Sequence, residues 1–149
     1  MTKMTKKAKE TEKSPENLEE CFAALDEVSS DSDRRYFKSQ KKGDASACFH
    51  HTLGRSLRNG WNLWDESAPL HKYFLNSGIF HADDMSGIII DSYHRYLNGK
   101  DIDLDGQIKF YKDFWAASGS ERQTLIFEEA GTVIINDYAR DSVARGKNE

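Results

Sequence analysis

The apolar residues of this chain recur at three- and four-residue steps in several separate segments. Between residues 14 and 29, the residues at this spacing are Leu18, Phe22, Leu25 and Val28. Such spacing places apolar side chains on one face of an α-helix, whereas a half-buried strand would alternate at every second residue. The sequence therefore predicts an all-α fold, a compact orthogonal bundle of about five to six helices.

Five further segments follow the same pattern. Helical spacing of apolar residues recurs over residues 34–40, 44–59, 69–77, 83–97 and 104–117. Residues with capping or special backbone preferences mark the ends of the predicted helices. Ser14 is expected to start the first helix and Asp44 to cap the helix over residues 44–59. Gly60, Gly78 and Gly99 are expected to end helices, because glycine adopts the left-handed conformation found there.

The segment from residue 121 to 145 admits two interpretations. Residues 132–135 are Thr-Val-Ile-Ile, which favours a strand because β-branched side chains pack well on a sheet. The same segment also satisfies helical spacing, through Leu125, Ile126, Ala130, Val133, Ile134 and Tyr138. A lone strand would have no partner elsewhere in the chain, so a long carboxy-terminal helix is predicted.

The length of the chain, 149 residues, suits one domain and is too short for two. A single helical domain is expected over residues 14–145, between a disordered basic tail at residues 1–13 and a disordered end at residues 146–149. The tail holds five lysines against two glutamates, and subtracting its +3 from the net charge of −4 leaves −7 on the rest. An acidic body of this kind argues against general nucleic-acid binding.

The hydropathy of the chain and its two cysteines indicate where in the cell it is expected. No apolar run approaches the roughly 20 residues that cross a bilayer, and the lysine-rich start lacks the apolar stretch of a secretory signal. Cys21 and Cys48 lie within helical apolar patterns, so they are predicted to be buried small hydrophobic residues rather than a disulfide. A reducing, cytoplasmic location without membrane contact is expected.

Paired residues in the middle of the chain carry a family resemblance. The pairs are Gly-Arg at 54–55, Arg-Asn at 58–59 and Leu-Trp at 63–64, with further likeness at residues 83–86 and 96–100. They resemble a bacterial family known only as a domain of unknown function, over about residues 49–115. The resemblance implies a compact domain with a fixed set of polar residues, and it implies no reaction, ligand or catalytic residue.

The segment Asp101-Ile102-Asp103-Leu104-Asp105-Gly106 reproduces the first half of an EF-hand calcium loop. In that loop, carboxylates at positions one, three and five converge on the ion, and glycine at position six makes the turn. Position twelve should be a bidentate glutamate, but it is Lys112 here. The alternative interpretation is that Asp103 or its neighbour caps the next helix while the other acidic residues face water.

The histidines do not follow the spacing of a zinc site. The five are His50, His51, His71, His81 and His94, and neither a His-Glu-x-x-His nor a Cys-x-x-Cys motif is present. Partly buried, hydrogen-bonded histidines are the simpler interpretation. His81, beside Asp83 and Asp84, is expected to belong to the start of a helix.

A candidate binding surface combines basic and aromatic residues. His51, Arg55 and Arg58 are spaced to share one polar side of a helix, and arginine can hold a phosphate or a partner's carboxylate through paired donors. The same arginines could instead only brace neighbouring helices. Trp61 and Trp64 follow directly and are expected to fold back on this helix as an aromatic corner of the core.

Three classes of function follow from these features. The favoured one is a noncatalytic interaction module for a protein partner, such as a phage or bacterial accessory, immunity or inhibitor protein, because it needs no missing motif. The second is a calcium-binding helix-loop-helix protein that uses Asp101, Asp103 and Asp105. The third is a small hydrolase that acts on a phosphorylated substrate through His51, Arg55 and Arg58. No glycine-rich phosphate loop, serine elbow or reactive cysteine supports an enzyme, so no catalytic residue and no cofactor is assigned.

Overall fold

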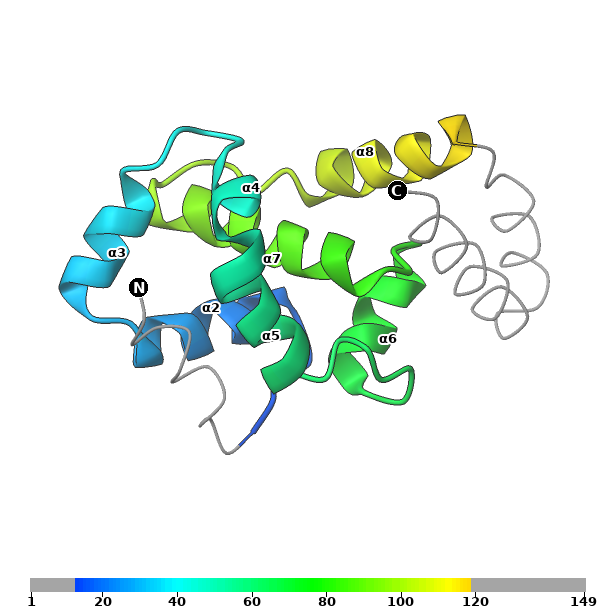
Figure 1. Ribbon diagram of the computed structural model, residues 1–149, viewed down its shortest axis with the longest axis horizontal. Coiled ribbons are helices and arrows are strands. Elements are labelled where there is room, and N and C mark those ends of the chain that lie inside the picture. The colour runs from blue at the N-terminus through cyan, green and yellow to red at the C-terminus, as the bar shows by residue number, and fades with distance from the viewer. Residues whose placement is uncertain (1–12, 119–149) are drawn as a thin grey trace.

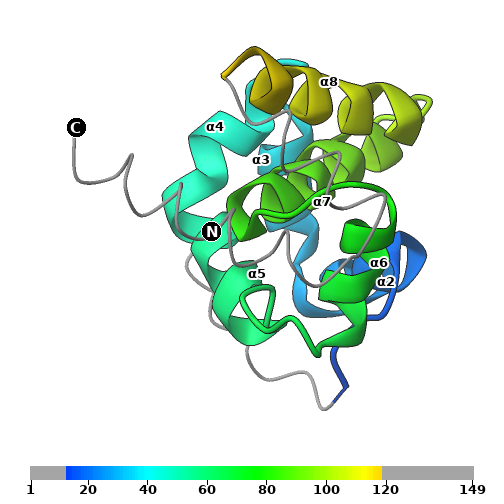
Figure 2. The same ribbon diagram turned by 90° about the vertical axis from the view of Figure 1, so that its right-hand side faces the viewer.

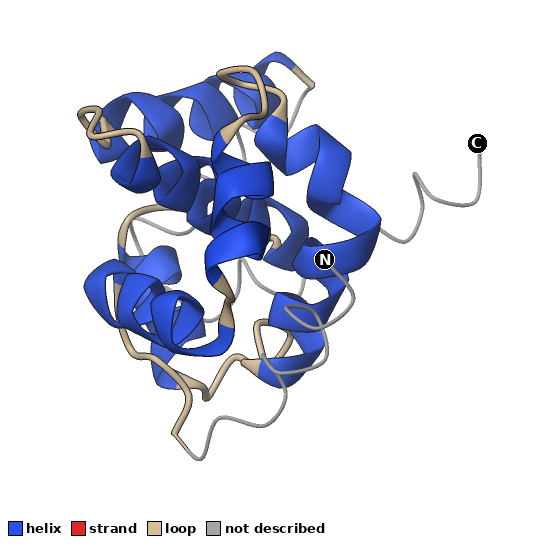
Figure 3. Cartoon of the chain, turned by 90° about the vertical axis from the view of Figure 1, so that its left-hand side faces the viewer, coloured by secondary structure: helices blue, strands red, loops and turns tan. Residues whose placement is uncertain are grey.

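The structure is a computed structural model that describes residues 13–118, and these residues form helices without a strand (Figure 3). In chain order the elements are α2 (Leu18–Val28), α3 (Asp31–Lys38), α4 (Ala45–Phe49), the π-helical turn η1 (His50–Gly54), α5 (Arg55–Gly60), α6 (Pro69–Asn76), α7 (Ala82–Leu97) and α8 (Leu104–Ala117). The all-α prediction is confirmed. The predictions for residues 1–12, for the helix at residues 121–145 and for the end at residues 146–149 lie outside the described residues.

Helix α7 is the centre of the bundle. The other helices all contact it, and α4, η1 and α5 run across it in Figure 1 while α8 lies alongside it. A helix surrounded in this way must be apolar on most of its circumference. Its buried residues accordingly include Met85, Ile88, Ile89, Ile90 and Tyr93, and the small Ser86, Gly87 and Ser92 are buried with them.

The segment predicted as one helix over residues 44–59 is helical throughout but not uniform. Its middle turn, His50–Gly54, is wider than an α-helical turn, and α4 and α5 continue it on either side. Gly54 lies under the guanidinium group of Arg58, and a Cβ at this position would lie 2.8 Å from Arg58 Nη1 and 3.3 Å from the carbonyl oxygen of Phe49. Glycine is therefore required where the side chain of Arg58 folds back over the π-helical turn.

Several predicted helix starts are wrong. α2 begins at Leu18 rather than at Ser14, because the side chain of Asn17 accepts a hydrogen bond from the backbone N–H of Glu20 at 2.9 Å and caps the helix. α3 begins at Asp31, three residues earlier than predicted, because Ser30 and Asp33 form a capping box.

The start of α4 is capped from a distance. Asp44 makes no capping hydrogen bond through its side chain, contrary to prediction. Instead, Oδ1 of Asp91, on α7, accepts a hydrogen bond from the backbone N–H of Ser46 at 3.0 Å. A carboxylate near the positive end of a helix dipole serves the same purpose whether or not it is local in sequence.

The predicted glycine stops are confirmed at two of three places. Gly78 and Gly99 have positive φ angles of 91° and 63° and follow α6 and α7. Gly60 is the last residue of α5, and the left-handed conformation falls on Asn62 instead, with φ of 54°. Asparagine tolerates this conformation better than most residues.

The aromatic corner after α5 is only partly in the core. Trp61 is buried, as predicted, and so is Leu63, but Trp64 is 56% exposed. The two cysteines are free, and Cys21 is buried while Cys48 is exposed, so the prediction that both are buried is wrong for Cys48. Within residues 13–118, no helix combines the length and the apolar character needed to span a bilayer.

Candidate functional site

The polar residues of greatest interest gather around the start of α7. We call them the α7 entrance cluster, and it comprises Arg58, Trp64, His81, Asp83, Asp84 and Trp115. They come from α5, from the loop after α5, from the first turn of α7 and its N-cap, and from the last turn of α8. The cluster thus joins residues that are up to 57 positions apart in the chain.

Arg58 is the buried centre of this cluster. Its side chain is 6% exposed, and Nε lies 3.2 Å from Oδ1 of Asp83. Nη1 donates to Oγ of Ser86 at 2.9 Å, and Nη2 donates to the backbone carbonyl of His50 at 3.1 Å. A buried charge needs partners of this kind, because an unpaired one is strongly unfavourable. The guanidinium group therefore ties η1 and α5 to α7, and its donors are directed into the protein.

His81 is the N-cap of α7, which agrees with its predicted place at a helix start. Its Nδ1 accepts a hydrogen bond from the backbone N–H of Asp83 at 3.0 Å. This bond requires Nδ1 to be unprotonated, so the ring proton of the neutral form belongs on Nε2. Burial, together with the nearby positive charge of Arg58, lowers the pKa of His81, although the charge of Asp83 opposes this shift. The cap is therefore intact when the imidazole is neutral.

Two tryptophans flank the imidazole of His81. The ring of Trp64 meets it edge-on with centroids 5.7 Å apart, and the ring of Trp115 stacks at 6.4 Å. Trp115 also donates from Nε1 to Oδ2 of Asp84 at 2.8 Å. Burial raises the pKa of Asp84 to about 6, the hydrogen bond from Trp115 opposes the rise, and the charge of Asp83 adds to it. Through these contacts α8 is fixed to the first turn of α7.

The predicted binding residues separate into two groups. Arg58 and Trp61 are buried, whereas His51, Arg55 and Trp64 are exposed. The shared polar side expected for His51, Arg55 and Arg58 is therefore not formed: His51 lies within the π-helical turn, and of the two arginines of α5 only Arg58 is buried. Arg58 belongs to the interior, and His51 and Arg55 to the surface.

The exposed basic residues are connected electrostatically to the α7 entrance cluster. Burial lowers the pKa of His50, and the positive charges of Arg58 and, more weakly, of His51 and Arg55 contribute in the same direction. His50 in turn contributes to the lowered pKa of His81. The charges of His51 and Arg55 thus act on His50, and that of His50 on His81 within the cluster.

The acidic residues 101–105 do not form a metal site in the structure. α8 begins at Leu104, so most of the would-be calcium loop is already helical. Asp103 adopts a left-handed conformation and caps α8, with Oδ1 accepting from the backbone N–H of Gly106 at 3.2 Å. Asp101 and Asp105 are exposed. Within residues 13–118, no three His, Cys, Asp or Glu side chains gather closely enough to hold a metal ion. The five histidines therefore do not form a metal site with one another or with these acidic residues.

The sequence did not reveal the partners of Arg58. Asp83 and Ser86 are three residues apart on α7, a spacing that puts both on one helix face. From the sequence, Asp83 and Asp84 are expected only to lie near His81 at the start of a helix. The pairing with Arg58 depends on how α5 crosses α7, which periodicity within one helix does not specify.

Comparisons with known proteins identify a family and no individual relative. Residues 14–97 match the family model described as Domain of unknown function (DUF6794). The match begins earlier than the expected resemblance over residues 49–115 and ends with α7, so it contains Arg58 and its partners and leaves α8 outside. No curated protein and no solved structure matches the chain. Because the match covers more than half of its length, the chain belongs to the DUF6794 family of domains of unknown function.

Proposed function

We propose that this chain is a noncatalytic, cytoplasmic interaction module that binds a protein partner through its exposed residues His51, Arg55 and Trp64. We call these three residues the Trp64 face. The observation that carries the proposal is the exposure of Trp64, 56% of whose surface is accessible although the ring rests on His81. Tryptophan and arginine are the residues most often found at the energetic centre of protein interfaces.

The rigidity of the underlying cluster supports this proposal. Trp64 rests on His81, which caps α7, and Arg58 fixes η1 to the same helix. A surface held in this way loses little conformational entropy when a partner binds. The buried donors of Arg58 are directed at Asp83, Ser86 and His50, which disfavours its use in holding a phosphorylated substrate.

The chemistry of the Trp64 face indicates the kind of partner. Arg55 carries a permanent positive charge and can pair with a carboxylate, while Trp64 offers a large apolar ring. We therefore expect the partner to present an acidic side chain next to an apolar one. A partner of opposite charge would also associate faster, because the complementary charges steer the encounter.

The test compares partner capture by the full chain and by surface variants. A protein captured from the native host by the wild type should bind at least about tenfold more weakly to Trp64→Ala and to Arg55→Ala, because interface centres of this kind contribute roughly 2 kcal/mol or more. Tyr36→Ala is the matched control, since Tyr36 is an aromatic residue of α3 with a similar exposure of 55%. Equal binding by all three variants, or the absence of any captured protein, would contradict the proposal.

A further inference from the structure

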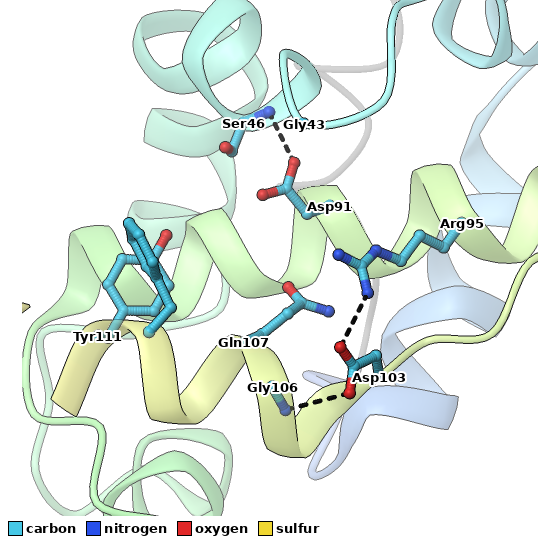
Figure 4. A pocket seen from close by; sticks show the side chains of 9 residues that line it. Gly43, Ser46, Asp91, Arg95, Asp103, Gly106, Gln107 and Tyr111 are labelled. Carbon is cyan, nitrogen blue, oxygen red and sulfur yellow. Dashed lines mark hydrogen bonds and ion pairs between the residues drawn. The ribbon is translucent and has the colours of Figure 1, made fainter. Parts of the chain in front are cut away.

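A second site lies away from the Trp64 face, between the start of α4, the middle of α7 and the first turns of α8. A cavity of about 360 Å³ opens there, and Figure 4 shows the side chains around it. The residues that matter are Ser46 from α4, Asp91 and Arg95 from α7, and Gln107, Phe110 and Tyr111 from α8. The volume is at the lower end of the range of small-molecule sites, roughly 300 to 1,000 Å³.

Asp91 places a carboxylate at the wall of this cavity. Its Oδ1 accepts the hydrogen bond from the backbone N–H of Ser46 that caps α4, and the side chain of Ser46 also hydrogen-bonds to the carboxylate. The ion pairs among residues 13–118 do not include Asp91. Burial raises the pKa of Asp91, and the two hydrogen bonds from Ser46 and, more weakly, the charges of Arg95 and His94 oppose the rise. A further cation beside the carboxylate would compensate more of its buried charge.

Gln107 supplies a second acceptor beside Asp91. Its side chain is held rigidly, because Nε2 donates to Oγ of Ser92 at 3.0 Å and to the backbone carbonyl of Ile102 at 2.9 Å. Both amide hydrogens are thereby directed into the protein, and the carbonyl oxygen is turned toward Asp91 in Figure 4. The residue is only 9% exposed, so this orientation is fixed by its surroundings.

Arg95 lies on the other side of the cavity with the opposite charge. It follows Asp91 by one helical turn, and Nη1 donates to the backbone carbonyl of Ile102 at 2.7 Å. Its ion pair with Asp103 is long, at 4.0 Å, and Asp103 is already occupied as the cap of α8. The guanidinium group therefore retains donors for an anionic group.

Aromatic side chains complete the cavity. Phe110 is 65% exposed at its rim, and Tyr111 lies half-buried against α7, where a Cβ at Gly87 would lie 2.7 Å from its hydroxyl oxygen. An aromatic face next to a carboxylate favours cations and the apolar parts of a ligand. The cavity thus offers two acceptors, a nearby guanidinium group and an apolar rim.

We propose that this cavity binds a small zwitterion of the amino-acid type, with Asp91 and Gln107 accepting hydrogen bonds from its ammonium group and Arg95 pairing with its carboxylate. An ammonium and a carboxylate attached to one carbon atom match two opposite charges carried one helical turn apart. The apolar rim at Phe110 receives the side chain of the ligand. This site is independent of the Trp64 face.

The first test uses ligands that differ by one charge. Free amino acids are titrated singly into the full chain, and binding is followed by calorimetry and by NMR shifts of the residues around the cavity. At least one amino acid should bind in the millimolar range or tighter, whereas its N-acetyl derivative, which lacks the ammonium group, and its amide, which lacks the carboxylate, should each bind at least about tenfold more weakly. Equal binding of all three forms, or binding of none, would overturn the proposal.

The second test removes the charge of the site without removing its structural bond. Asp91→Asn keeps an oxygen that can accept from the N–H of Ser46, so α4 remains capped and circular dichroism should be unchanged. Binding of the amino acid should fall at least about tenfold. Asp101→Asn is the matched control, because Asp101 is an exposed carboxylate outside the cavity, and it should bind as the wild type does. A folded Asp91→Asn protein with unchanged affinity would refute the assignment.

Discussion

Arg58 shows at the scale of one residue how a charge can hold a small bundle together. Its guanidinium group contacts a carboxylate, a hydroxyl group and a backbone carbonyl from α7 and η1. These partners satisfy the charge, and the charge in turn fixes how α5 crosses α7. The neighbouring Arg55, three residues earlier, is exposed and makes no comparable contribution.

Replacing Arg58 should therefore destabilise the protein far more than replacing Arg55. For Arg58→Ala we expect a loss of about 2–4 kcal/mol in the free energy of unfolding, because Ser86 and the carbonyl of His50 lose their donor and the packing of α5 on α7 is disturbed. The loss is less than for a fully buried pair, since the side chain of Asp83 is 41% exposed. Arg55→Ala should change stability by less than about 0.5 kcal/mol. Urea unfolding of both variants measures the difference.

Asp84 should make stability depend on pH in the opposite direction from an ordinary salt-bridged carboxylate. Its pKa is raised from 3.8 to about 6, so the folded state favours the protonated form. The resulting stabilisation is present below the unfolded pKa and is lost as the pH rises through about 6. Asp84→Asn, which can still accept from Trp115, should match the wild type near pH 4 and exceed it by about 1–2 kcal/mol at pH 7.

Thermal unfolding across this pH range tests the Asp84 prediction. Asp101→Asn is the control, because Asp101 is exposed and should show no such pH-dependent gain. If Asp84→Asn were no more stable than the wild type at neutral pH, burial of the ionised carboxylate would not destabilise the folded state.

At the scale of the elements, the helices could be predicted from the sequence, but the contacts that cap or widen them could not. Apolar spacing specifies each helix because it is a local property, and α6 begins at Pro69, the first residue of the range predicted for it. The cap of α4 comes from Asp91, 45 residues away, and the π-helical turn depends on a guanidinium group folding back over Gly54. Neither feature can be recognised until the helices have been packed together.

For the same reason, only part of the candidate site was predictable. His51 and Arg55 are on the surface, but so is Trp64, which was expected in the core, and nothing in the sequence distinguishes Arg58 from Arg55 as the buried member. Asp103 was correctly considered as a helix cap, because capping depends on neighbouring residues alone. The cavity at Asp91 joins three elements and had no local signal.

Gly54 provides a test of the π-helical turn. Glycine to alanine in a regular helix stabilises by up to about 1 kcal/mol. Here Gly54→Ala should instead destabilise by about 1–3 kcal/mol, because the added Cβ would crowd both Arg58 Nη1 and the carbonyl of Phe49. In an Arg58→Ala background the penalty should shrink, and a double-mutant cycle by urea unfolding measures the coupling. A simple gain in stability from Gly54→Ala in the wild type would show that the close approach is absent.

At the scale of the whole molecule, the core and the family match coincide. Every residue of the buried apolar core among residues 13–118 lies between Leu18 and Tyr93. The match ends at residue 97, and α8 adds only partly buried side chains to this core, including Ile108 and Tyr111. As Figure 2 shows, α8 covers α7 from outside rather than entering the bundle.

A fragment of residues 13–97 should therefore fold on its own. We expect a cooperative thermal transition with helical circular dichroism and a free energy of unfolding reduced by about 2–4 kcal/mol relative to a fragment of residues 13–118, because the apolar contacts of α8 and its bonds through Gln107 and Trp115 are missing. Calorimetry of the two fragments makes the comparison. A shorter fragment without a cooperative transition would show that α8 is an integral part of the domain.

The central position of α7 also affects how the chain is made. The preceding helices all pack on α7, yet its residues are synthesised after theirs. Synthesis proceeds at roughly 5 to 20 residues per second, so several seconds pass between the synthesis of the first of the helices α2 to α6 and that of α7, on which they pack. Their apolar faces are open to other proteins in the cell during that interval, so the nascent chain is most vulnerable to aggregation just before α7 emerges.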